Sequence, residues 1–171
     1  MFSKQRIKLF FFVLISANLF AGCSLARPTS DDSTQSSSID FSAIEDRQLI
    51  PVQIGSNQLT VEVVNTSASL TQGLGGRDRI GSDGMLFSLP QRQIAEFWMR
   101  GMSFPLDFVW IDGDQIVGML ENAPAPSNQD IVNLPTYSSK EPVTLVLELD
   151  AGRVAKLQLA VGDRLTIGTQ N

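Results

Sequence analysis

Residues 84–114, GMLFSLPQRQIAEFWMRGMSFPLDFVWIDGD, decide the fold that this sequence predicts. The stretch holds both tryptophans, Trp98 and Trp110, and it ends in the turn signal Asp112-Gly113-Asp114. Short apolar runs separated by turn residues are typical of β-strands. We therefore expect this stretch to be the buried centre of a small β-rich domain, with a few charged side chains among apolar neighbours.

Alternation within the stretch predicts which side chains share a face. In an extended strand, successive side chains point to opposite sides. A strand over 94–100 therefore places Trp98 and Arg100 on the face opposite its apolar side. We expect this strand to be joined to a strand at 85–87 by a turn through Pro90.

Elements on both sides of these strands complete the predicted architecture. Two hairpins are expected, 49–54 with 59–64 and 106–111 with 116–120, and a short helix from Ser67 to about Leu74 that Gly73, Gly75 and Gly76 stop. Later elements are a long loop at 122–142, a strand at 143–149, a helical turn capped by Asp150 and a last strand at 164–167. The fold class is mainly β, a small barrel or rolled antiparallel sheet with two short helices and no βαβ alternation.

Composition limits the possible chemistry. The 171 residues contain no histidine and one cysteine, so Ser-His, Cys-His and His-ligated metal sites are excluded, and no metal or cofactor is expected. The formal net charge is −5. Without the basic residues Lys4, Arg6 and Lys8 it becomes about −8, which argues against nucleic acid as a partner, because such binding depends on neutralising phosphates.

The first 22 residues predict a signal peptide. A basic start is followed by an apolar run at 9–19, which is too short to cross a bilayer as a helix. The sequence Leu19-Phe20-Ala21-Gly22-Cys23 resembles the lipobox of bacterial lipoproteins, although Phe20 departs from the usual aliphatic residue. The resemblance implies cleavage before Cys23, a thioether link from Cys23 to diacylglycerol, acylation of the new amino terminus by a chain such as palmitate, and stable membrane anchoring.

Residues 23–46 then predict a flexible tether rich in Ser, Thr and Asp, because they cannot bury enough apolar surface to offset their ordering entropy. Residues 47–171 form the single globular domain. We expect this domain to face the periplasm or the outside of a bacterial cell envelope. The absence of aspartate at Ser24 favours the outer membrane.

Asp107 is the leading candidate for a functional side chain, because an unpaired charge among apolar strand neighbours would be very costly. Two interpretations stay open. Asp107 pairs with Arg100 or Arg77, or caps backbone amides, to fix the fold; alternatively it belongs to a ligand-binding cleft. Glu148 is the carboxylate of another strand that could join it.

The predicted ligand groove combines these residues with aromatic surface. Trp98 is the best aromatic for a binding platform, and Tyr137 anchors the long loop as a flap. The complete candidate set is Arg77, Trp98, Arg100, Asp107, Tyr137 and Glu148.

Several short motifs occur together in one order and spacing. They are Gly73-Leu74 with Arg77, Gly84-Met85-Leu86-Phe87, Phe97-Trp98-Met99, Pro105-Leu106-Asp107 with Asp112, Leu147-Glu148 with Gly152, and Gly162-Asp163. This set resembles the DUF192 family, a domain of unknown function, over about Leu59 to Ile167. The resemblance implies a small β-rich domain without an established activity. Arg100-Gly101-Met102 stands where the family usually has Lys-Asn-Thr.

The sequence thus predicts a lipid-anchored extracytoplasmic domain that binds a small molecule, a glycan or an envelope partner without catalysis. One alternative is a carboxylate-dependent hydrolase that uses Asp107 and Glu148. The other is a purely structural envelope lipoprotein.

Overall fold

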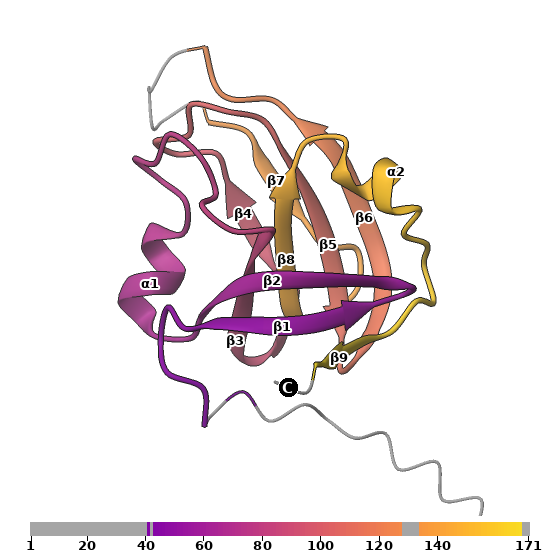
Figure 1. The fold of residues 1–171 in the computed structure, drawn as a ribbon. Helices are drawn as coiled ribbons and strands as arrows, with labels where there is room; N and C mark the ends of the chain where they lie inside the picture. Colours follow the sequence, from indigo (N-terminus) through magenta and orange to yellow (C-terminus); the bar gives the residue numbers. More distant parts are fainter. Residues whose placement is uncertain (1–40, 42, 128–133, 169–171) are drawn as a thin grey trace, which may run out of the picture. The chain divides into compact units, whose positions relative to one another are not determined.

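The computed structural model describes residues 41, 43–127 and 134–168. In chain order the elements are β1 (Leu49–Ile54), β2 (Asn57–Val64), α1 (Ser67–Gln72), β3 (Gly84–Gln93), β4 (Glu96–Trp98), β5 (Leu106–Asp112), β6 (Gln115–Ala123), β7 (Thr136–Ser138), β8 (Val143–Asp150), α2 (Arg153–Leu157) and β9 (Leu165–Ile167) (Figure 1). The predicted signal peptide, Cys23 and the tether as far as residue 40 lie outside the described residues. Within them, no helix has the length and apolar character needed to cross a bilayer.

Seven strands form one curled sheet in the order β6-β5-β8-β3-β2-β1-β9, and β4 pairs with β7 in a second, two-stranded sheet. The outer strands β6 and β9 meet at one end, where Ile116 N donates to the Asp163 carbonyl at 2.9 Å and a bridge links Gln115 to Arg164. The sheet is therefore a half-barrel closed at that end, and the predicted mainly β fold with two short helices is confirmed.

One strand pair departs from the predicted pattern. β2 and β3 run parallel, with Val61 opposite Gly84 and Val64 opposite Phe87. A parallel pair needs a crossover, and α1 lies within it (Figure 1). The predicted rolled sheet was antiparallel throughout, so this one parallel pair was not expected, and the crossover is what brings α1 beside β3.

Two apolar layers lie on the two faces of the large sheet. Because side chains alternate along a strand, β5 contributes to both: Phe108 and Trp110 belong to one cluster, and Val109 and Ile111 to the other. The first layer, which also contains Phe87, packs against Phe97 of β4 and Tyr137 of β7. This layer carries the candidate site.

Local differences from the sequence prediction have simple causes. Pro90 lies inside β3, where the pairing with β8 shifts register between Ser88 and Gln93, and proline is tolerated at such irregular strand positions. The predicted turn there is wrong. The long loop contains β7, whose three residues pair with β4 and carry too short a pattern to be recognised. α2 has Gly152 at its N-cap, not Asp150.

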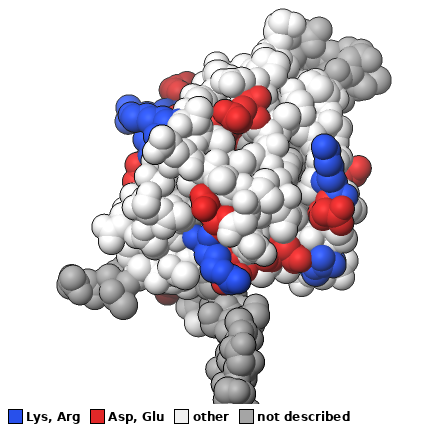
Figure 2. Space-filling view, turned by 90° about the vertical axis from the view of Figure 1, so that its right-hand side faces the viewer, with Lys and Arg blue, Asp and Glu red and all other residues white. Residues whose placement is uncertain are grey.

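Charges on one face of the domain are mixed. Figure 2 shows basic side chains next to acidic ones and no continuous basic area on the face in view. The ion pairs Arg92–Asp112 and Arg164–Asp114 are of this exposed kind.

Candidate functional site

A cavity of about 390 Å³ lies between α1, β3 and β4. Three of the predicted site residues line it, Trp98, Arg100 and Glu148. The apolar part of its wall comes from residues of several elements: Leu70, Leu74, Phe87, Leu89, Phe97, Met102 and Leu106. Polar side chains also line it: Ser67, Thr71, Gln72, Gln93 and Glu96. Concave sites with apolar walls and a few polar groups are the usual form of small-molecule sites.

Glu148 forms the buried polar point of this cavity. In β8 it lies opposite Phe108 and Met85, on the face of the sheet that α1 and β4 cover, and its residue exposure is 5%. Its Oε2 atom has no hydrogen-bond partner among the described residues. A carboxylate placed so would carry an uncompensated buried charge, which is very costly.

Burial accordingly raises the pKa of Glu148 from 4.5 to about 8. At neutral pH the side chain is therefore a neutral carboxylic acid, which both donates and accepts a hydrogen bond. Glu148 is thus a buried acid in the cavity lining, and its Oε2 atom has no hydrogen-bond partner among the described residues.

Trp98 and Arg100 form the exposed rim of the same cavity. Trp98 is 51% exposed, and the Arg100 guanidinium lies 5.2 Å from its ring centroid, which is cation–π distance. Within the described part of the chain, no acidic side chain forms an ion pair with Arg100. The cavity thus has an available cation at its rim and a neutral acid in its interior.

A glycine-rich loop after α1 supplies one wall. The helix ends at Gly73, whose φ of 50° favours glycine, and Gly76 N donates to the Gly101 carbonyl at 2.9 Å. A Cβ on Gly75 would lie 2.9 Å from the Arg100 carbonyl oxygen, so only glycine lets the two segments approach. The helix was predicted to run from Ser67 to about Leu74 and ends at Gln72, with Gly73 as its C-cap. The loop also positions the residues around Arg100.

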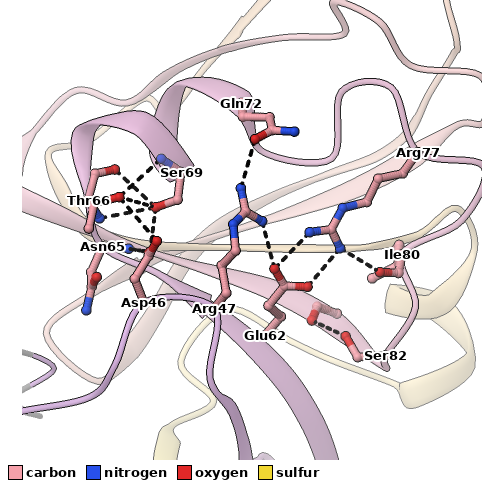
Figure 3. Close-up of polar contacts among 11 residues, drawn as sticks. Asp46, Arg47, Glu62, Asn65, Thr66, Ser69, Gln72, Arg77, Ile80 and Ser82 are labelled. Atoms are coloured by element: carbon pink, nitrogen blue, oxygen red, sulfur yellow. Dashed lines mark hydrogen bonds and ion pairs between the residues drawn. The ribbon is translucent and has the colours of Figure 1, made fainter.

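Arg77 lies outside the cavity, in an ion-pair network with Glu62. Its two terminal nitrogens donate to Glu62 Oε2 at 2.7 Å and Oε1 at 2.8 Å, and Arg47 donates to Oε1 at 2.9 Å (Figure 3). The hydrogen bonds from Arg77, more than any other contact, lower the pKa of Glu62. Arg77 N also donates to the Leu74 carbonyl at 3.1 Å, so the network holds the cavity wall in place.

The beginning of α1 is held by Asp46. Ser69 Oγ donates to Asp46 Oδ1 at 2.6 Å and Thr66 Oγ1 to Oδ2 at 3.2 Å, while Thr66 and Ser69 also form a capping box (Figure 3). The hydrogen bond from Ser69 is the largest influence that lowers the pKa of Asp46. Polar contacts therefore fix both ends of the helix that borders the cavity.

Asp107 is fully buried and has two backbone partners. Its Oδ1 accepts from Asn122 N at 2.8 Å and its Oδ2 from Val154 N at 2.9 Å. The first contact accommodates the irregular pairing of β5 with β6, and the second caps α2, whose Gly152 has no side chain to do so. Of the two open interpretations, the geometry matches the capping of backbone amides.

Asp107 and Glu148 do not form a pair. Asp107 lies opposite Leu149, on the face of the sheet that carries Val109. Glu148 lies opposite Phe108, on the other face. The sheet separates the two carboxylates. The geometry required by the alternative hydrolase is therefore absent.

Tyr137 is in β7, where it pairs with Phe97, and it lines a second cavity of about 490 Å³ with Trp110 and Met119. It is not among the residues that line the first cavity. The structure thus brings Trp98, Arg100 and Glu148 together and places Arg77, Asp107 and Tyr137 elsewhere.

Sequence reasoning missed the apolar part of the cavity. Phe87 and Met102 were predicted only as part of the buried centre at 84–114, and the helix that borders the cavity with them was not placed beside them. The run from Gly73 to Gly76 carries the relevant signal, because such a run also permits close contact between backbones.

Comparison with known proteins assigns the chain to a family. The family model of DUF192, described as "Uncharacterized ACR", matches residues 50–167. The chain belongs to the DUF192 family. No curated protein matches the chain.

Two solved structures are similar to this fold. One, from Sinorhizobium meliloti 1021 and provisionally named a transcription regulator, is 31% identical with a TM-score of 0.63, and the match covers 72% of this chain and 96% of that one. The other, a protein of unknown function from Novosphingobium aromaticivorans DSM 12444, is 28% identical with a TM-score of 0.60, covering 72% and 89%. The similarity identifies the fold and assigns no activity.

Proposed function

We propose that this DUF192 protein is a lipid-anchored extracytoplasmic binding domain that holds a small molecule in the cavity between α1, β3 and β4. The observation that carries the proposal is Glu148, a residue that lines this cavity and whose buried Oε2 atom has no hydrogen-bond partner among the described residues. An unpaired buried polar group is costly, and a ligand that hydrogen-bonds to it recovers part of that cost.

The surroundings of Glu148 support binding without catalysis. The carboxylate predicted to act with it as a general acid and base pair, Asp107, is on the other face of the sheet, and the other acidic side chain that lines the cavity, Glu96, is exposed. The side chains nearest in the strand register, Met85 and Phe108, are apolar. Recognition of a small, partly apolar molecule is the chemistry that these residues support best.

A fragment screen by ligand-observed NMR tests the cavity. We expect some small aromatic fragments to bind the purified full-length chain, and Trp98→Ala to weaken them about five- to tenfold, because this exposed ring borders the cavity. Val161→Ala is the matched control: Val161 is 63% exposed and borders the second cavity. Absence of binding to the wild type, or equal weakening by both variants, would contradict the proposal.

The lipid anchor rests on the lipobox-like sequence before Cys23. In a bacterial host supplied with an alkyne-tagged palmitate, we expect the wild-type chain to be labelled and to sediment with membranes, because two or more acyl chains give stable anchoring. Cys23→Ala should lose both the label and the sedimentation. Equal labelling of the variant, or an unlabelled wild type, would exclude lipidation at Cys23 and leave the binding proposal to be judged by the fragment screen.

A further inference from the structure

The polar groups of the cavity also indicate which ligand it takes. Among the described side chains that line it, the charged or titratable ones are Glu96, Arg100 and Glu148. Glu148 is buried and Arg100 is exposed, but both line the cavity and both carry a hydrogen-bond donor: the protonated carboxyl group of Glu148 and the guanidinium of Arg100.

Glu148 is a donor because of where it lies. Its Oε2 is enclosed, no basic side chain reaches it, and its strand neighbours across β3 and β5 are Met85 and Phe108. An acid in such surroundings retains its proton, because ionisation would leave a buried charge without a counterion. The retained proton needs an acceptor, and the residues that the structure describes offer none to Oε2.

Arg100 is a donor by its nature, since a guanidinium has five N–H groups and no acceptor. It forms no ion pair with a described acidic side chain and lies over Trp98 at the rim. Glu96, the opposing charge, is exposed, so solvent and salt screen its effect. The two donors therefore favour an anionic ligand rich in acceptor oxygens.

We propose that the cavity binds a small organic carboxylic acid: the carboxylate accepts a hydrogen bond from Glu148 and is neutralised by Arg100, while the hydrocarbon part packs against Phe87 and Met102. This inference rests on the proposed binding function and names its ligand class. Arrangements of this kind are favourable because hydrogen bonds to charged groups are stronger than neutral ones. Loss of such a bond costs about tenfold or more in affinity.

Three probes with one ring and different head groups test the ligand class: benzoate, benzamide and benzylamine. Measured by NMR titration on the full-length chain at pH 7, benzoate should bind at least about tenfold more tightly than the other two. Arg100→Met should reduce that affinity about tenfold or more. Glu96→Gln, which removes the opposing charge, should raise it slightly.

The pH dependence identifies the role of Glu148. Wild-type affinity for benzoate should fall as pH rises through about 8, where Glu148 ionises and repels the carboxylate. Glu148→Gln keeps a neutral donor and should keep the affinity without this fall, whereas Glu148→Leu should lose the affinity.

The outcomes separate the two proposals. Stronger binding of benzylamine, with weakening by Glu96→Gln, would show a cation site and overturn the ligand class while leaving the binding function intact. Equal binding of benzamide and benzoate would also overturn the class. If neither these probes nor any fragment of the screen bound in the cavity, both proposals would fail.

Discussion

Replacing Asp107 with alanine is expected to lower the free energy of unfolding by about 4 kcal/mol, because a buried and a part-buried backbone amide lose their acceptor at about 1–3 kcal/mol each. These are the amides of Asn122, in the irregular part of β6, and Val154, in the first turn of α2. The substitution also leaves a small void under fully buried apolar neighbours, which adds to the loss. Urea denaturation monitored by tryptophan fluorescence measures the change.

Asp107→Asn should recover part of the stability, because its amide oxygen can accept from only one of the two N–H groups. Asp112→Asn is the control: this aspartate pairs with Arg92 at the surface, and exposed pairs contribute little. Fragment binding measured in urea-free buffer should survive in Asp107→Asn. A stable Asp107→Ala protein that had lost ligand binding would mean that Asp107 acts in the site and not in the fold.

The second large effect concerns the pH dependence of stability and comes from Glu148. Its pKa is raised in the folded protein to about 8, so the folded state keeps a proton that the unfolded state releases near pH 4.5. Below the unfolded-state pKa both states are protonated and the full stability is present. Between about pH 5 and pH 8, the free energy of unfolding should then fall by up to about 1.4 kcal/mol per pH unit.

Glu148→Gln should remove this slope, because glutamine does not titrate. At pH 7 it should also raise the free energy of unfolding by roughly 1–3 kcal/mol. Asp46 and Glu62 act in a separate window: their lowered pKa values stabilise the fold above about pH 4.5, and this contribution is lost as pH falls. The exposed residue Glu141 supplies the control, since Glu141→Gln should retain the wild-type slope.

Much of the fold was predictable because its signals are local. Alternation from Ala95 to Arg100 placed Trp98 and Arg100 on the exposed face, and Gly73 marked the end of α1. The parallel pairing of β2 with β3 was not predictable in this way, because it depends on the path of the chain through α1 and not on the pattern of either strand.

The candidate site was predicted only in part, for a related reason. The partners of Asp107 are backbone amides 15 and 47 positions along the chain, and any residue except proline could supply them. The sequence therefore could not distinguish a capping carboxylate from a functional one. Glu148 has the opposite character: what distinguishes it is the absence of a partner for Oε2, which only the packed structure reveals.

The two buried carboxylates lie on opposite faces of one sheet, which in this way contributes to both stability and the proposed binding. Asp107 satisfies its oxygens within the fold and stabilises β6 and α2. Glu148 weakens the fold and presents an unused hydrogen-bonding group to a cavity of about 390 Å³. Groups with perturbed pKa values gather at functional sites for this reason.

The proposed site requires a protonated Glu148, and NMR observation of the carboxyl carbon of a ¹³C-labelled glutamate during a pH titration measures its protonation state directly. The signal assigned through its loss in Glu148→Gln should titrate near pH 8 in the ligand-free protein. A titration near pH 4.5, like that of an exposed glutamate, would contradict a neutral acid in the cavity and with it the proposed site.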